Sequence, residues 1–126
     1  MSDKHVNGWI GFDLDGTLAE YHGWGDGSVG VPIERMVNIV KQFIADGYTC
    51  KIVTARVSTR EGQELQQQKD YIEQWCIEVF EHPLEVTHQK DFHMYCLFDD
   101  RAVAVEKNTG KILGHCPSLG LFQNKE

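Results

Sequence analysis

The octapeptide Gly11-Phe12-Asp13-Leu14-Asp15-Gly16-Thr17-Leu18 decides how this chain is interpreted, because it joins an apolar run to two carboxylates. The apolar residues that precede and enter it predict a buried strand, which Gly16 ends; they are Val6, Trp9, Ile10 and Phe12. Asp13 and Asp15 therefore stand where a strand gives way to a loop. In an open α/β sheet, ligands bind at this edge.

Two carboxylates one residue apart indicate a site for a cation, since they repel each other unless positive charge lies between them. Carboxylate oxygens are hard ligands that favour Mg²⁺, which binds one or two carboxylates together with water and a substrate phosphate. The segment therefore indicates an Mg²⁺-assisted reaction at phosphorus. Taken alone, it also fits an exposed Asp-Gly turn whose acidic side chains are only solvated.

Length and composition limit the class of protein. The chain has 126 residues, enough for one compact domain, and we expect residues 1–126 to form a single domain. Its net charge of −7 argues against non-specific nucleic-acid binding, which needs a basic face. No apolar run approaches the length of a membrane span, and residues 1–5 hold no apolar signal-peptide segment. We therefore expect a cytoplasmic protein without membrane association, in which Cys50 and Cys96 are buried free thiols.

Helical and strand-like patterns alternate along the rest of the chain. Apolar residues at helical spacing predict a helix that begins near Pro32 and ends before Gly47, and a second helix at 64–77. Residues 102–105 fit either a short helix or a strand. Further strands are predicted at 49–54, 84–87, 95–98 and 112–113. This alternation predicts an α/β fold, a Rossmann-like three-layer α/β/α arrangement with a mostly parallel sheet and helices on both faces.

Three more features lie at or near the ends of predicted strands. Thr54 ends the second strand, where a hydroxyl can bind a phosphoryl oxygen, although such a threonine can equally bond its own backbone. Lys90 lies in a polar loop, where a lone lysine is ordinarily solvated. Asp99 and Asp100 directly follow an apolar strand, and an adjacent acidic pair in that place is costly without a cation.

Together these features resemble the signature of the haloacid dehalogenase-like (HAD-like) hydrolases. That signature is an apolar strand followed by Asp-x-Asp-Gly-Thr, then a strand ending in Thr, a Lys, and an apolar strand ending in Asp-Asp. This chain carries all four in that order, and the resemblance spans from about Ile10 to about Val105. It implies a HAD-like fold and Mg²⁺-dependent hydrolysis of a phosphomonoester through an aspartyl-phosphate.

The resemblance also implies roles for individual residues. Asp13 would be the nucleophile and a ligand of Mg²⁺. Asp15 would be the general acid and base, with its backbone carbonyl as a further metal ligand. Lys90 would offset negative charge on the nucleophile and the phosphoryl group. Asp99 and Asp100 would complete the metal site.

The segment after the second strand would hold the phosphoryl group. By resemblance, Thr54 is the phosphate-binding residue, and backbone N–H groups near Asp15 and Ala55 stabilise the phosphoryl group during transfer. Arg56 adds positive charge beside them, and it completes the predicted substrate-binding set of Thr54, Ala55 and Arg56.

The spacing of these motifs leaves no room for the cap domain that larger relatives insert. Residues 14–53 hold one loop and one helix, and residues 55–89 hold one helix and one short strand. We therefore expect an open site, unless a second copy in a homo-oligomer or the Gly-rich loop 21–30 covers it. The glycines of that loop permit large movements, and Tyr21 and Trp24 could then act as a lid over a substrate.

The phosphorylated substrate stays open at this point, between a nucleotide, another small molecule and a nucleic-acid end. Thr-Ala-Arg at 54–56 and Asp-Asp-Arg at 99–101 are also similar to the phosphatase part of polynucleotide kinases, which removes 3′-phosphates. Two alternatives are not enzymes: a receiver-like phosphoacceptor domain and a catalytically silent module that kept the fold. Receiver domains carry the paired acids on the first strand, whereas here the pair comes last.

Overall fold

A four-stranded parallel sheet with the strand order β3-β2-β1-β4 forms the centre of the protein. Its strands are β1 (Trp9–Asp13), β2 (Thr49–Val53), β3 (Glu85–Thr87) and β4 (Met94–Phe98). The computed structural model describes residues 8–114, so Val6 and residues 1–5 lie outside the described part. The parallel sheet and the α/β class are thus confirmed, as are the strands expected at 49–54, 84–87 and 95–98.

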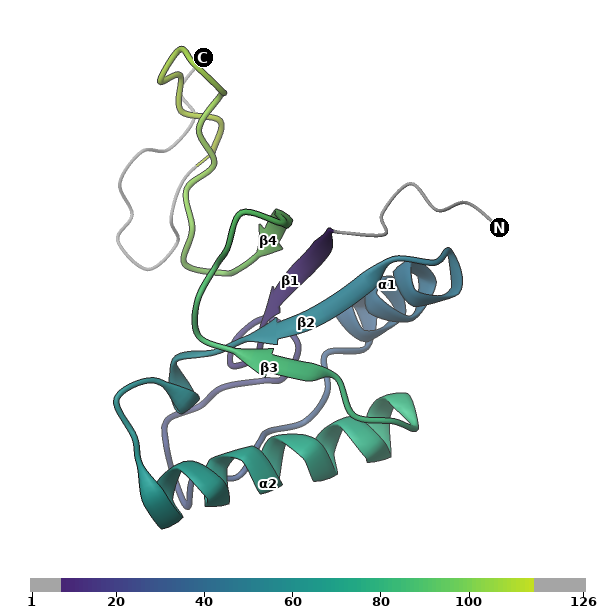
Figure 1. The fold of residues 1–126 in the computed structure, drawn as a ribbon, viewed down its shortest axis with the longest axis vertical. Coiled ribbons are helices and arrows are strands. Elements are labelled where there is room, and N and C mark those ends of the chain that lie inside the picture. Colours follow the sequence, from purple (N-terminus) through teal and green to yellow (C-terminus); the bar gives the residue numbers. More distant parts are fainter. Residues whose placement is uncertain (1–7, 115–126) are drawn as a thin grey trace.

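Two α-helices connect neighbouring strands of the sheet (Figure 1). Helix α1 (Glu34–Ala45) joins β1 to β2, and Gly47 follows it with a positive φ of 93°, which a glycine adopts without strain. The short 3₁₀-helix η1 (Ala55–Val57) and helix α2 (Gly62–Phe80) join β2 to β3. None of the described helices is long and apolar enough to cross a membrane.

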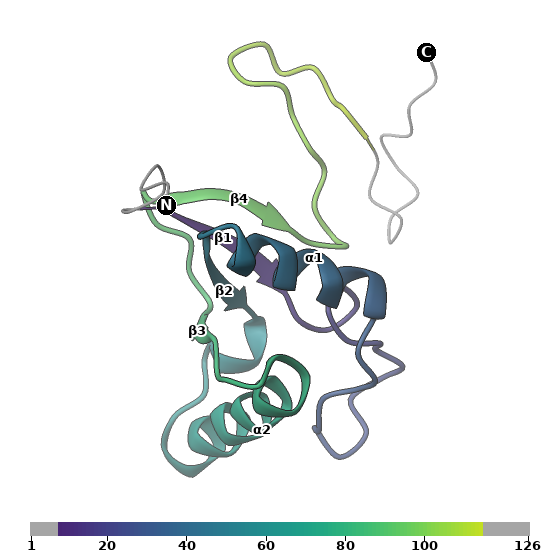
Figure 2. The ribbon, with the colours of Figure 1, turned by 90° about the vertical axis from the view of Figure 1, so that its right-hand side faces the viewer.

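Both helices pack on one face of the sheet, and the core lies between them and the strands (Figure 2). Alternate strand residues point to this face, among them Ile10, Phe12 and Ile52, which are at most 3% exposed. The Phe12 ring stacks on Phe98 at 4.8 Å and lies 6.1 Å from Phe43 of α1. Helix α2 contributes a row of buried residues to the same core: Ile72, Trp75, Cys76 and Phe80.

The described residues therefore form two layers, and the expected three-layer arrangement with helices on both faces is wrong for them. The chain steps from β1 to β2 to β3 in one direction, and right-handed crossovers place both connecting helices on the same face. A helix on the other face would have to lie between β3 and β4. Residues 88–93 join these strands without a helix and run over that other face, where Asp91 Oδ1 accepts a 2.9 Å hydrogen bond from the Trp9 indole.

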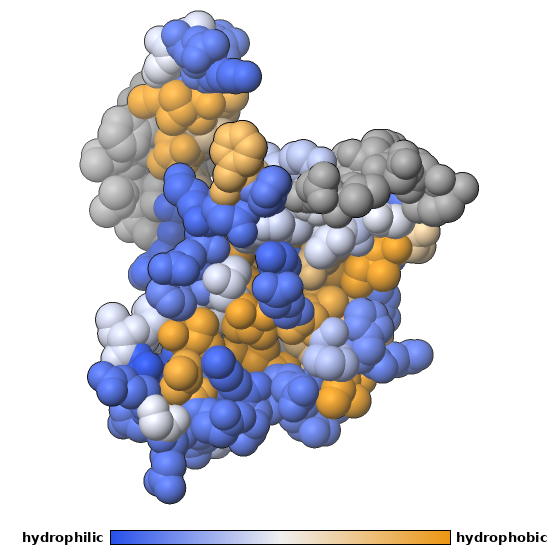
Figure 3. All heavy atoms as spheres, viewed as in Figure 1, coloured by the Kyte–Doolittle hydropathy of each residue, from blue (hydrophilic) through white to orange (hydrophobic). Residues whose placement is uncertain are grey.

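Residues after β4 extend away from the body as an arm, residues 101–114 (Figure 1). The alternatives expected at 102–105 and the strand expected at 112–113 reduce to one isolated bridge between Val105 and Ile112. Apolar side chains gather on this arm as well as between α2 and the sheet (Figure 3). Cys96, on the edge strand β4, is exposed, so its predicted burial is wrong. Although Cys96 pairs with Ile10, its strand lies at the margin of the face that the helices cover. Cys50 is buried, as predicted, and Cys116 lies outside the described residues.

Candidate active site

Three carboxylates meet at the carboxyl ends of β1 and β4. Asp13 is the last residue of β1, and Asp99 and Asp100 follow β4. The two strands are parallel neighbours with Phe12 opposite Phe98, so the residues that come next emerge side by side. One oxygen from each carboxylate lies within 4.8 Å of the others. Strand register alone thus gathers the acidic residues that the sequence pattern singled out.

The tight turn that follows β1 also lies close to the carboxylates. The Leu14 carbonyl accepts hydrogen bonds from the N–H groups of Leu18 and Ala19, at 3.0 and 2.9 Å, and closes a tight turn. Gly16 has a φ of 89°, and a Cβ atom there would lie 2.7 Å from Asp100 Oδ2. Only glycine therefore allows this backbone to approach Asp100 so closely.

Thr17 links the two sides of the cluster, a role that the sequence analysis did not assign. Its hydroxyl lies 3.0 Å from Asp100 Oδ1 and 3.3 Å from Asp13 Oδ2, and it accepts a 3.1 Å hydrogen bond from the Asp100 N–H. The side chain is buried. Its place in Asp-x-Asp-Gly-Thr was the signal available in the sequence, since a buried threonine next to two carboxylates must find a partner.

The electrostatics of this cluster favour a cation. Burial raises the pKa of Asp13 to about 8, helped by a hydrogen bond with Asp100 and by the charges of Asp99 and Asp100. Ionising all three carboxylates at once is thus costly without a compensating positive charge. Three hard oxygen donors so close together fit Mg²⁺, and they are the residues that could hold it.

Arg56 holds Asp15 in a bidentate ion pair. Its Nε donates to Asp15 Oδ2 at 2.7 Å and its Nη2 to Oδ1 at 2.8 Å. The remaining N–H groups donate to the carbonyls of Gly27 and Ser28 and to Gln68 Oε1. All five donors of the guanidinium are thereby used, and the side chain is 4% exposed.

Arg56 was predicted to bind substrate, and that role stays a prediction. In this structure every N–H group of its guanidinium is used within the protein, two of them on Asp15. Sequence reasoning also missed Gln68, which is 3% exposed on α2. The signal for Gln68 was its spacing, since Leu65, Gln68 and Ile72 follow one another on one face of a helix.

Thr54 and Ala55 lie at the mouth of the site, where the sequence placed them. Thr54 is buried, and its Oγ1 accepts a 3.1 Å hydrogen bond from the Arg56 N–H, so the hydroxyl caps η1. This is the backbone-bonding alternative described for such a threonine. Its backbone N–H bonds the Thr87 carbonyl of β3 at 2.9 Å. Ala55 is exposed beside it.

Lys90 lies exposed in the connection 88–93 and lines neither cavity at the site. It makes no hydrogen bond or ion pair with any described residue. Its proposed catalytic role stays a prediction.

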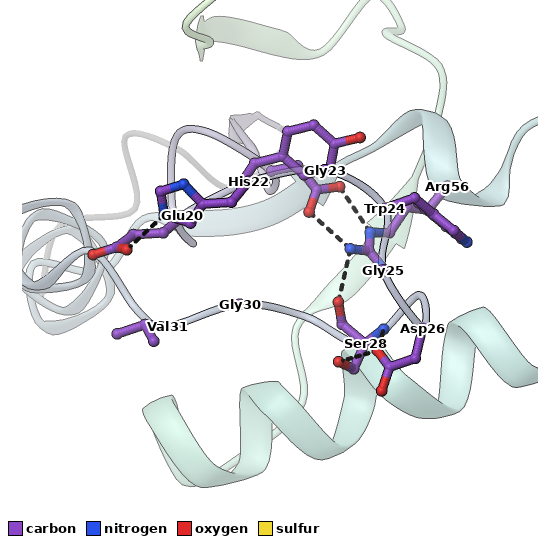
Figure 4. Close-up of a pocket in the computed structure, with 12 residues that line it drawn as sticks. Glu20, His22, Gly23, Trp24, Gly25, Asp26, Ser28, Gly30, Val31 and Arg56 are labelled. Carbon is purple, nitrogen blue, oxygen red and sulfur yellow. Dashed lines mark hydrogen bonds and ion pairs between the residues drawn. The ribbon is translucent and has the colours of Figure 1, made fainter.

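A cavity of about 480 Å³ opens over the carboxylates. It is lined by Asp13, Asp15, Gly16, Tyr21, Trp24, Thr54, Ala55, Arg56, Arg60, Asp100 and Arg101. A second cavity of about 250 Å³ lies under the loop 20–31 and shares Asp15, Tyr21, Trp24 and Arg56 with the first (Figure 4). The predicted site residues other than Lys90 and Asp99 thus all line the larger cavity.

The Gly-rich loop 21–30 is fastened to the body in this structure. Arg56 donates a 3.1 Å hydrogen bond to the Ser28 carbonyl (Figure 4). It also donates to the Gly27 carbonyl. The Trp75 indole of α2 donates a 2.9 Å hydrogen bond to the Gly30 carbonyl. The Trp24 ring lies beneath two guanidinium groups, those of Arg56 at 4.8 Å and Arg60 at 4.9 Å.

The fold and the site together define an α/β protein with a candidate metal centre at the carboxyl edge of its sheet. No protein-family model matches the chain, and no curated protein does. Among solved structures, it is similar to one described as a conserved protein coded by a locus from Bacteroides thetaiotaomicron. The identity is 20%, the match covers 74% of this chain and 75% of that chain, and the TM-score is 0.48.

Proposed function

We propose that this chain is an Mg²⁺-dependent phosphomonoester hydrolase of the HAD-like type that acts through an aspartyl-phosphate on Asp13. The observation that carries the proposal is the meeting of Asp13, Asp99 and Asp100 within 4.8 Å at the end of two parallel strands. Asp13 lines the large cavity, and the phosphate-binding candidates Thr54 and Ala55 line it from the neighbouring strand.

The reaction has two steps, in each of which Asp15 moves a proton. An Asp13 carboxylate oxygen attacks phosphorus, the bond to the leaving oxygen breaks, and Asp15 supplies a proton to that oxygen. Water then attacks the phosphorus of the aspartyl-phosphate, gives its proton to Asp15, and releases inorganic phosphate. Asp13, Asp99 and Asp100 would hold Mg²⁺, which would supply positive charge to offset the carboxylates and the phosphoryl oxygens.

The Arg56–Asp15 pair adds a condition to this mechanism. Each Asp15 oxygen accepts one hydrogen bond from Arg56, so the transferred proton must use the remaining lone pair of one of these oxygens. The two bonds to Arg56 keep the carboxylate oriented toward the cavity. Arg56 therefore positions the acid and base, and the surrounding contacts to Gly27, Ser28 and Gln68 fix Arg56 itself.

The direct test is the release of inorganic phosphate from phenyl phosphate with and without Mg²⁺, in wild type and in Asp13→Asn. We expect Mg²⁺-dependent turnover that falls by roughly three orders of magnitude or more in the variant, because the covalent route is lost. Asp70→Asn, an exposed carboxylate on α2, is the matched control and keeps wild-type turnover. A hydroxylamine-sensitive label on Asp13 after brief reaction with labelled substrate would support the intermediate.

Two results would redirect the proposal. A stable label on Asp13 with almost no release of phosphate would indicate a receiver-like phosphoacceptor. Wild-type rates in correctly folded Asp13→Asn would rule out covalent catalysis by this residue.

A further inference from the structure

The strongest unassigned group beside the cavity is Arg60, in the bend between η1 and α2. Its side chain lines the same cavity as Asp13 and is partly exposed. No described residue accepts a hydrogen bond from its guanidinium or pairs with its charge. Arg60 thus differs from Arg56, whose five donors are all used inside the protein.

Arg60 is nevertheless held in place. Its guanidinium lies over the Trp24 ring, 4.9 Å from the centroid. A cation–π contact holds a guanidinium over a ring without using its N–H groups as hydrogen-bond donors, so these donors stay available to another partner. The preceding residue, Thr59, has a φ of 56°, an unusual conformation for a β-branched side chain. The chain therefore adopts a strained backbone directly before Arg60, next to a cavity with catalytic candidates.

The charges around the cavity indicate what Arg60 would bind. Asp13, Asp15 and Asp100 line it, and Arg56 is already paired with Asp15. A phosphomonoester approaching these carboxylates brings further negative charge. A positioned guanidinium with unused donors binds carboxylate or phosphate groups well, since its donors can form two parallel hydrogen bonds with two oxygens.

We propose that Arg60, held on the Trp24 ring, binds a second anionic group of the substrate. The substrate is then a phosphomonoester that carries a further phosphate or carboxylate, placed across the cavity from the phosphoryl group that reacts. This inference rests on the proposed function, because it assumes that the reacting phosphoryl group sits at Asp13. It adds a selectivity that the acidic cluster alone does not have.

The test compares substrates that differ only in the group opposite the reacting phosphate. These are 4-carboxyphenyl phosphate, 1,4-phenylene bisphosphate and 4-carbamoylphenyl phosphate, whose amide group is uncharged. All are assayed with Mg²⁺ at fixed ionic strength. We expect wild type to favour at least one charged substrate over the amide by about tenfold in kcat/KM, the size of a charge-assisted hydrogen bond. The two charged compounds distinguish a carboxylate site from a phosphate site.

Three variants locate the effect. Arg60→Gln should remove the preference, Arg60→Lys should keep part of it because the charge remains, and Lys41→Gln should leave it unchanged. Lys41 is an exposed cation on α1 that lines neither cavity at the site. Melting temperatures of all variants show whether a change reflects the fold. A preference that survives in well-folded Arg60→Gln, or that wild type never shows, overturns the proposal.

A binding measurement separates failure of the subsite from failure of the proposed function. Titration calorimetry with Mg²⁺ compares (4-carboxybenzyl)phosphonate and (4-phosphonobenzyl)phosphonate with (4-carbamoylbenzyl)phosphonate, none of which can be hydrolysed at phosphorus. Tighter binding of a charged ligand that depends on Arg60, without any turnover of the esters, would retain the subsite and reject the hydrolase. Turnover with equal binding of all three would do the reverse.

Discussion

At the scale of single residues, the state of Asp13 in the metal-free protein determines how stability responds to pH. Its pKa is raised from 3.8 to about 8 in the folded protein, so between these values the native state holds a proton that the unfolded chain releases. Stability contributed by this group is therefore complete below about pH 4 and is lost as the pH rises through about 8.

In EDTA, we expect the melting temperature of wild type to fall relative to that of Asp13→Asn as the pH rises from 5 to 9. The asparagine cannot ionise, so at pH 9 the variant should melt at least about 3 °C higher than wild type. Circular dichroism melts over this pH range measure the difference, with Asp70→Asn as the control. Parallel curves for wild type and Asp13→Asn would mean that Asp13 is not buried among like charges.

Arg56 gives a second prediction, because it separates positioning from substrate binding. Arg56→Lys keeps the charge but loses the bidentate fork and most of the contacts to Gly27, Ser28 and Gln68. We expect kcat for phenyl phosphate to fall about tenfold or more while KM changes less than about twofold, since Asp15 is misplaced. The fold should lose about 1–3 kcal/mol.

Arg35→Lys, on the exposed surface of α1, is the matched control for Arg56→Lys. A large rise in KM with an unchanged kcat would restore the direct substrate contact that the sequence indicated for Arg56. Steady-state kinetics at several pH values add a further readout, because a misplaced general acid changes the pH profile and a lost binding contact does not.

At the scale of elements, the loop 21–30 behaves as a wall of the site. It is fastened through Gly27, Ser28 and Gly30, and Trp24 lies under two guanidinium groups while 41% of its surface stays exposed. A fixed wall and a closing lid predict different effects of removing the Trp24 ring on stability and on activity toward larger substrates.

We expect Trp24→Ala to lower the melting temperature by a few degrees, as about 1–2 kcal/mol of ring contacts is lost. It should reduce kcat/KM by similar factors for phenyl phosphate and for 1-naphthyl phosphate, and Trp24→Phe should restore part of both. A selective rise in KM for the larger substrate, with an unchanged melting temperature, would instead support the lid.

The sequence predicted most of the helices and strands, but it did not predict which side chains of different elements contact one another. The spacing of apolar residues predicted α1, α2 and the four strands. An element that buries one face must carry apolar residues at a regular interval, and this interval can be recognised within the segment itself. The pairing of Arg56 with Asp15 could not be predicted, since it joins residues 41 positions apart with a loop, α1 and β2 between them. Lys90 shows the same limit: its residue type fits the family pattern, but the structure leaves it exposed in the connection 88–93, where it lines neither cavity at the site.

At the scale of the whole molecule, metal binding should be coupled to stability. Asp13, Asp99 and Asp100 come from opposite ends of the chain and repel one another in the fold alone. A cation that binds only the native arrangement raises apparent stability by mass action, by about 2.7 kcal/mol at one hundred times its Kd.

We therefore expect millimolar Mg²⁺ to raise the melting temperature above its value in EDTA at pH 8. Asp99→Ala should shrink this rise, whereas Asp46→Asn, at the far end of α1, should not. Scanning fluorimetry with and without metal measures both. An equal melting temperature of wild type in EDTA and in saturating Mg²⁺ would argue against a metal site at the three carboxylates.

The strand order also determines when the acidic cluster can form, because β4, which sets Phe98 opposite Phe12, comes last of the four strands in the sequence. The hydrogen bond between Thr17 and Asp100 joins residues 83 positions apart, so closing it orders a long stretch of chain. While the chain is being synthesised, β1, α1, β2 and α2 emerge before β4, and during that interval Asp13 has neither acidic neighbour. A chain still on the ribosome therefore carries Asp13 without Asp99 and Asp100, and the three-carboxylate cluster forms only when the last strand docks.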